Sequence, residues 1–273
     1  MADDRPIGVF DSGVGGLTVL RALSAALATE TFLYLGDTAR LPYGTKSPAS
    51  VVRYATQCAS VLIERGIKAL VVACNTASSA ALPALAARFP SVPVIGVVEP
   101  GAIAAVAASR SGHIAVVATE GTIRGGAYRA AIERLHPGAH VTGISGSVFV
   151  ALAEEGWTEG AVTELVAHRY LDPLFSGAGG PDTLLLGCTH FPVLASALRE
   201  VVPKHVTLVD SAATTAAATV ELLERRGLRR STAAGPRARL RFLATDGPER
   251  FARIGSIFLG ASVAARDVEL IDV

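Results

Sequence analysis

The chain has 273 residues, half of them apolar and 18% charged, which excludes a disordered protein and allows one large domain or two of ordinary size. The formal net charge of +1 gives no general attraction to nucleic acid or to an anionic membrane. Three cysteines without a CxxC pair argue against a disulfide framework and against a structural zinc site.

Local composition bears on the compartment and on partners. The first residues lack the basic and apolar regions of a signal peptide. The uncharged stretch 69–87 is as long as a membrane span, but polar residues and a proline fill its centre, so a strand, a turn and a helix explain it better. The arginine-rich segment 225–241 has almost no aromatic residues and is expected to be a solvated surface. We therefore expect a cytoplasmic protein with reduced thiols that binds neither membrane nor nucleic acid.

Short apolar runs alternate with helical patterns in the first part of the chain. The runs predict strands at 7–10, 31–36, 69–73 and 92–98. The longer patterns predict helices at 17–28 and 50–65, and a third helix that follows Asn75. Pro83 fits poorly inside this third helix and is expected to kink or restart it.

The same alternation begins again after residue 112. It predicts strands at 113–119, 140–145, 182–187, 205–210 and 239–245. It predicts helices at 125–135, 158–174, from near 192, at 212–226 and at 249–259. The last strand and helix are expected to close the chain.

Strands that alternate with helices indicate an α/β fold with mainly parallel sheets covered on both faces. The two successive sets predict two pseudo-symmetric domains with the active site in the cleft between them. We place the first domain at 1–97 plus 210–273 and the second at 98–209. Ligands of such sheets bind beyond the carboxyl ends of strands, where the loops "DSGVGG", "GDTARLPYG", "CNTAS", "ATEGT" and "GCTHFP" lie.

Two of the three cysteines stand in matching positions, where an apolar strand ends and a helix begins. The positive end of a helix favours a thiolate, so Cys74 and Cys188 are candidates for a nucleophile or a base. Either one alone could equally be a buried core residue, but the repeated setting lowers that chance. Cys58 has Ala and Val neighbours in a helical pattern and is assigned to the core.

Other polar residues could assist a thiol. Asp11 ends the first strand ahead of a glycine-rich turn, whose N–H groups could hold a carboxylate, and Asp11 could orient or assist a base. His190 follows Cys188 by two residues and could relay a proton. No spacing of three ligands indicates a metal, and no further cofactor signature accompanies the few lysines, so we expect no metal and no cofactor. Two thiols on facing lobes suit removal of a proton from carbon and its return from the opposite face.

The motifs "DSGVGGLTV", "GDTARLPYG", "ACNTAS" and "LLLGCTHFP" resemble those of the glutamate racemases, in the cofactor-independent aspartate/glutamate racemase superfamily. They stand in the family's order and approximate spacing, and the resemblance spans nearly the whole chain. It implies interconversion of L- and D-glutamate without pyridoxal phosphate or metal, which supplies D-glutamate for bacterial peptidoglycan. Within the same superfamily, aspartate or another amino acid is an alternative substrate. A noncatalytic regulatory relative is a further alternative, against which the two intact thiols argue.

The resemblance also assigns roles. It implies that Cys74 takes the proton from D-glutamate and that Cys188 takes it from L-glutamate. Asp11, Glu154 and His190 match the polar residues credited with assisting the thiols; Glu154 depends on alignment of "FVALAEE", because Gly146 and Ser147 stand where the family often has Cys-Pro. The implied substrate contacts are Asp11, Ser12, Tyr43, Gly44, Asn75, Thr76, Thr119, Thr122, Thr189 and His190. The expected partner is a small-molecule substrate, and a homodimer is the assembly considered.

Overall fold

Parallel strands build two separate sheets in the computed structural model, which describes residues 3–177, 179–230 and 239–273. The six-stranded sheet has the order β10-β9-β2-β1-β3-β4, and the four-stranded sheet has the order β6-β5-β7-β8. Pairings such as Val9 with Tyr34 and Val116 with Leu185 are parallel. The strands are β1 (Ile7–Asp11), β2 (Thr31–Gly36), β3 (Ala69–Val72), β4 (Val94–Gly96), β5 (His113–Ala118), β6 (His140–Ser145), β7 (Thr183–Gly187), β8 (Thr207–Asp210), β9 (Arg239–Ala244) and β10 (Val268–Leu270).

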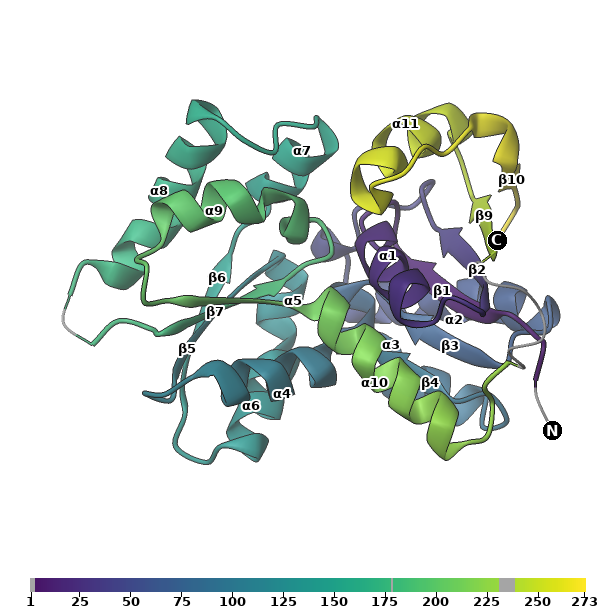
Figure 1. Ribbon diagram of the computed structural model, residues 1–273, viewed down its shortest axis with the longest axis horizontal. Helices are drawn as coiled ribbons and strands as arrows, with labels where there is room; N and C mark the ends of the chain where they lie inside the picture. The colour runs from purple at the N-terminus through teal and green to yellow at the C-terminus, as the bar shows by residue number, and fades with distance from the viewer. Residues whose placement is uncertain (1–2, 178, 231–238) are drawn as a thin grey trace.

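Helices cover both sheets and define two lobes (Figure 1). The first lobe holds the six-stranded sheet with α1 (Leu17–Ala26), α2 (Pro48–Glu64), α3 (Asn75–Arg88), α10 (Ser211–Arg225) and α11 (Pro248–Leu259). The second lobe holds the four-stranded sheet with α4 (Val98–Ala108), α5 (Glu120–Gly125), α6 (Ala127–Leu135), α7 (Val148–Glu154), α8 (Ala161–Phe175) and α9 (Ala195–Val201). Two loops reach the space between the lobes, and each contains a short 3-10 helix, at Tyr43–Thr45 and at Phe191–Leu194.

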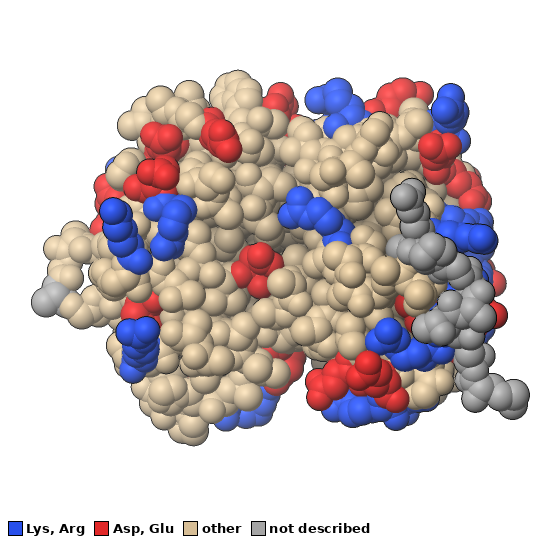
Figure 2. All heavy atoms as spheres, viewed as in Figure 1, with Lys and Arg blue, Asp and Glu red and all other residues tan. Residues whose placement is uncertain are grey.

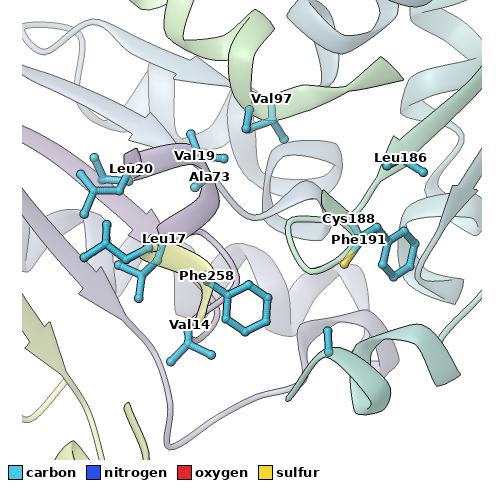
Figure 3. Close-up of a cluster of buried hydrophobic side chains, with 14 of the residues drawn as sticks. Val14, Leu17, Val19, Leu20, Ala73, Val97, Leu186, Cys188, Phe191 and Phe258 are labelled. Carbon is cyan, nitrogen blue, oxygen red and sulfur yellow. The ribbon is translucent and has the colours of Figure 1, made fainter. Parts of the chain in front are cut away.

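Burial on both faces explains why the strands read as continuous apolar runs. In β1, Ile7 and Val9 pack into one core cluster and Phe10 into another on the opposite face, because successive side chains of a strand alternate. The first of these clusters continues into the second lobe, where it includes Leu186 and Phe191. Figure 3 shows part of this cluster with side chains from both lobes around Cys188. The lobes therefore share apolar packing next to the expected site.

Several elements differ from the expectations. The strand expected at 92–98 is limited to Val94–Gly96, and α4 begins at Val98, where Pro100 falls in the first turn and needs no N–H. The helix α3 runs without interruption through Pro83. The helices α4, α5 and α7 and the edge strand β10 were not anticipated, so the chain does not close on α11.

Surface features agree with the bulk composition. On the face in view, positive and negative side chains are interspersed (Figure 2). Within residues 3–177, 179–230 and 239–273, none of the helices has the combined length and apolar character that crossing a membrane requires. The uncharged stretch 69–87 forms β3 and most of α3. Arg237, part of the arginine-rich segment, lies outside the described residues.

Candidate active site

Loops from the carboxyl ends of both sheets meet around a small cavity of about 40 Å³. That volume is on the scale of a few water molecules, so the cavity must widen before an amino acid can enter. It is lined by Ser12, Pro42, Tyr43, Gly44, Cys74, Asn75, Thr76, Thr119, Val150, Cys188, Thr189 and His190. The structure thus brings most of the expected residues together, with one thiol from each lobe.

Three expected residues lie just behind this lining. Asp11 ends β1 directly before Ser12 and is fully buried. The Thr122 hydroxyl is 3.1 Å from the Thr76 hydroxyl. Glu154 Oε1 is 3.1 Å from His190 Nε2. Each can therefore act on the cavity through the residue in front of it.

Cys74 caps the N-terminus of α3, as the strand-to-helix pattern predicted. Its sulfur accepts a hydrogen bond from the Ala77 N–H at 3.4 Å, and only 5% of the residue is exposed. Burial, followed by the charge of Asp11, raises the pKa of this thiol to about 12, although hydrogen bonds from Ser12 and Ala77 oppose the rise. Desolvation therefore opposes the thiolate that the helix terminus was expected to favour. In this form of the site the thiol of Cys74 is favoured, and it can donate a proton.

Cys188 has a different environment, set by a chain of three side chains. Its sulfur lies 3.8 Å from His190 Nδ1, and the other ring nitrogen of His190 faces Glu154. Glu154 Oε2 accepts a hydrogen bond from Arg250 at 2.8 Å. Burial acts to raise the pKa of Glu154, but the hydrogen bond and charge of His190 and the charge of Arg250 hold it below its usual value. Glu154 is thus a carboxylate that can hold a protonated His190 against the Cys188 sulfur.

The same contacts determine the protonation of His190. Burial alone would lower the pKa of its imidazole, but hydrogen bonds with Cys188 and Glu154 and the negative charges around it raise the pKa from 6.5 to about 10. His190 is therefore an imidazolium at neutral pH. From the sequence, His190 could either relay a proton or set the local charge. Because its imidazole is already protonated at neutral pH, it supplies a positive charge beside Cys188.

A raised pKa for a base makes stability depend on pH. The contribution of His190 is present in full below the unfolded pKa of 6.5 and is lost as pH rises through about 10. The pKa of the Cys74 thiol is 9.0 in the unfolded chain and higher in the folded protein, so this thiol lowers the free energy of unfolding only above pH 9. Between pH 7 and 9 the free energy of unfolding should fall by about 1 to 2 kcal/mol more in the native protein than in His190→Gln. Urea unfolding of both proteins at the two pH values measures this difference. An equal fall in the free energy of unfolding in the two proteins would contradict a protonated His190.

Asp11 combines a held oxygen with a free one. Its Oδ2 accepts the Gly13 N–H at 2.9 Å, whereas Oδ1 is buried without a hydrogen-bond partner. Burial raises the pKa of this carboxyl, while the charge of His190 and the N–H groups of the glycine-rich turn oppose the rise. The orphaned oxygen can accept a hydrogen bond from a cationic or hydroxyl group that reaches it when the cavity widens.

Glycine is required in the turn after Asp11 because other groups come very close. A Cβ added to Gly15 would overlap the His190 ring and lie 2.5 Å from the Thr189 hydroxyl. A Cβ on Gly16 would lie 2.6 Å from that of Asp11. The first-lobe turn therefore packs directly on the second-lobe loop that carries Cys188.

Neutral donors occupy the opposite wall. The hydroxyls of Thr76, Thr119 and Thr122 form a triangle with distances of 3.0 to 3.1 Å. Asn75 accepts a hydrogen bond from Tyr128 at 2.6 Å, which orients the amide, and leaves its Nδ2 buried and without a partner. These groups can donate hydrogen bonds to an anion without adding net charge.

Sequence reasoning missed several residues that shape this site. Pro42 and Val150 line the cavity, and Tyr128 orients Asn75. Thr18 donates to the Thr189 carbonyl at 3.0 Å, a contact between the lobes. Motif position could have indicated Pro42, which lies inside a quoted loop. Thr18 and Val150 likewise lie inside the quoted stretches "DSGVGGLTV" and "FVALAEE", whereas Tyr128 stands in a helix whose sequence carries no local sign of the site.

The fold and the site define a two-lobed α/β enzyme in which two thiols from facing sheets share one small cavity. Residues 7–219 match the family model described as Asp/Glu/Hydantoin racemase, and the chain belongs to this family. Family membership makes the protein a racemase, which is an isomerase.

Relatives match over nearly the full chain. The glutamate racemase of Geobacter metallireducens is 49% identical over 259 residues, which cover 95% of this chain and 94% of the relative. The glutamate racemase of Francisella tularensis, solved in complex with D-glutamate, has a TM-score of 0.89 at 34% identity and covers 99% of this chain and 98% of its own. The Thermus thermophilus enzyme, solved with beta-chloro-D-alanine, has a TM-score of 0.86 at 43% identity with the same coverage.

Proposed function

We propose that the protein is a glutamate racemase that interconverts L- and D-glutamate by a two-base mechanism. The observation that carries the proposal is the pair of buried thiols, Cys74 from one lobe and Cys188 from the other, on a single cavity. The names of the relatives, which are similar over nearly their whole length, support glutamate as the substrate.

The reaction moves one proton in and one proton out. One cysteine, as its thiolate, takes the α-proton from the substrate, and the electron pair of the broken C–H bond passes into the α-carboxylate. The other cysteine, as its thiol, then gives its proton to the opposite face of the same carbon. The number of protons on the enzyme is unchanged, but the thiol and the thiolate have exchanged places. The following turnover therefore runs from the other enantiomer, or the two cysteines re-equilibrate first.

The polar groups of the cavity suit this substrate. Asn75 Nδ2 has no partner in the protein and can donate to a carboxylate that gains charge in the transition state. The hydroxyls of Ser12, Thr76, Thr119 and Thr189 are further neutral donors. Once the cavity has widened, the free oxygen of Asp11, which lies behind the lining, can accept a hydrogen bond from the substrate ammonium. Tyr43 and Gly44 complete the wall.

The two thiols are proposed to act on opposite faces of the substrate α-carbon. Cys74 acts on D-glutamate and Cys188 on L-glutamate, and Asp11 and the His190–Glu154 pair assist them. The different surroundings of the thiols support separate roles, since Cys74 faces a carboxylate and a helix terminus while Cys188 faces an imidazolium.

The wider setting is part of the proposal. D-glutamate made here would enter peptidoglycan, and the cytoplasm would keep the buried thiols reduced. A homodimer is the proposed assembly.

NMR of L- and D-glutamate in D₂O with the protein tests reaction type and substrate together. We expect loss of the α-proton signal from both enantiomers and equal final amounts of each. Aspartate and alanine serve as comparison substrates. If the α-proton of aspartate exchanged and that of glutamate did not, the substrate would be aspartate. If no amino acid exchanged its α-proton, the proposal would be wrong.

A further inference from the structure

One helix of the first lobe reaches across to the corner of the second lobe that carries the His190–Glu154 pair. This helix, α11, lies beside α7 in Figure 1, and its Arg250 is hydrogen-bonded to Glu154 at 2.8 Å. Further along the same helix, the Phe258 ring contacts the His190 ring edge-on, with centroids 5.1 Å apart. A Cβ on Gly156, just after α7, would lie 3.4 Å from Ile257. The helix thus touches Glu154, His190 and the end of α7 together.

The contacts of Glu154 connect the helix to the thiol. Its two carboxylate oxygens have different partners, because Oε2 accepts from Arg250 and Oε1 faces His190 Nε2. His190 Nδ1 in turn faces the Cys188 sulfur. The sequence of groups Arg250, Glu154, His190 and Cys188 therefore begins in one lobe and ends at the thiol of the other.

We propose that Arg250 is a positioning residue that couples closure of the two lobes to the pairing of Cys188 with His190, an inference that rests on the proposed racemase function. When α11 meets α7, Arg250 fixes Glu154, and Glu154 turns His190 toward the sulfur. When the lobes separate to admit substrate, the Arg250–Glu154 bond breaks and Glu154 loses the partner that holds it in place.

Exposure makes this contact suitable for repeated opening. The Arg250 side chain is 50% exposed, whereas that of Glu154 is 15% exposed. A half-exposed ion pair is screened by water and salt and contributes little to folding stability, so it can break and re-form during turnover. The cavity of about 40 Å³ requires such opening, because it must widen for an amino acid.

The first test compares Arg250→Leu with Arg253→Leu, which removes an exposed arginine from the same helix. Because the two enantiomers have equal free energy in water, kcat/KM must fall by the same factor in both directions, and we expect a loss of roughly 10-fold to 100-fold in Arg250→Leu. Arg250→Lys should recover part of the activity, and Arg253→Leu should match the native protein.

Isotope effects separate positioning of Cys188 from general loosening. Transfer to or from Cys188 should limit the rate more in Arg250→Leu than in the native protein. The isotope effect on kcat/KM should therefore rise with 2-deuterated L-glutamate and fall with the 2-deuterated D-enantiomer. A purely structural defect would lower kcat/KM without this opposed change, and either that result or native activity would overturn the proposal.

A second measurement does not depend on racemase activity. Alkylation by iodoacetamide, read by mass spectrometry of the cysteine peptides, reports opening of the cleft. Arg250→Leu should speed alkylation of Cys74 and Cys188 several-fold and leave that of Cys58, a buried residue of α2, unchanged. Equal rates in the two proteins would overturn the coupling to closure even if the protein fails to racemise glutamate. Absence of racemisation by the native protein would instead count against the proposed function.

Discussion

Replacement of either Cys74 or Cys188 by serine is expected to abolish racemisation, with a loss of at least about 10³-fold in kcat/KM. Serine keeps the size of the side chain and can still accept the Ala77 N–H at position 74. Its hydroxyl, however, loses a proton far less readily than a thiol, so it cannot serve as a base near neutral pH. Each variant removes one of the two groups that must act in every turnover, so one intact cysteine does not suffice.

The two serine variants should differ in what they still exchange. In D₂O, Cys188→Ser should wash deuterium into D-glutamate only, through Cys74, and Cys74→Ser should wash it into L-glutamate only. Proton NMR of each enantiomer, incubated separately, reads this directly. Cys58→Ser is the matched control, because Cys58 is also buried but lies in α2 away from the cavity, and it should racemise at nearly the native rate. Full turnover by Cys188→Ser would end the two-base mechanism.

The strands were the most predictable part of the fold. A strand buried on both faces must be apolar at every position, so runs such as "IGVFD" and "TLLLG" are visible without any structure. The α/β alternation and the parallel sheets followed from the same runs and are confirmed. The boundaries 97/98 and 209/210 stay predictions; the strands of the two sheets fall on the expected sides of them, except that β8 of the second sheet extends one residue past 209 to Asp210.

The missed elements lack such a signal for physical reasons. The helices α5 and α7 have six and seven residues, too few for a helical repeat to stand out. The helix α4 has eleven residues, but its sequence VEPGAIAAVAA is apolar at most positions, so it shows no clear helical repeat, and its first residue was assigned to the preceding strand. The strand β10 has three residues and two of them are exposed. Pro83 was expected to kink or restart α3, but Ala81 and Leu85 on either side of it are fully buried, and their packing offsets the roughly 3 kcal/mol cost of an interior proline.

Site position was more predictable than site chemistry. Strand ends placed Asp11, Cys74 and Cys188 near one another from sequence alone, and the structure brings them to one cavity region. The protonation state of Cys74 could not be foreseen, since it depends on burial and on a carboxylate far away in sequence. Arg250 gave no local sign either, because its partner Glu154 is 96 residues distant.

The change Asp11→Asn is expected to remove most of the activity without reducing stability. Asparagine can still accept the Gly13 N–H but replaces the free carboxylate oxygen by an amide, so it can neither accept from an ammonium there nor assist a thiol. We expect kcat/KM to fall by about 10² to 10⁴-fold, the usual range for an acid/base group. Burial raises the pKa of Asp11, so the charged carboxylate costs stability at neutral pH, and the neutral amide removes that cost.

The change Asp182→Asn should have the opposite outcome, which makes it the matched control. This carboxylate stands before β7, at the end of the sheet away from the cavity, and accepts hydrogen bonds from the Ser109 hydroxyl and from the Arg110 and Ser111 N–H groups at 2.6 to 2.7 Å. Burial acts to raise the pKa of Asp182, but these hydrogen bonds hold it well below its usual range. Ionised Asp182 therefore stabilises the fold at pH values above its pKa in the unfolded chain. Asp182→Asn should lower the urea midpoint and keep kcat/KM. If Asp11→Asn instead lost stability in proportion to activity, Asp11 would be a structural support for the glycine turn, and its free oxygen would have no part in the reaction.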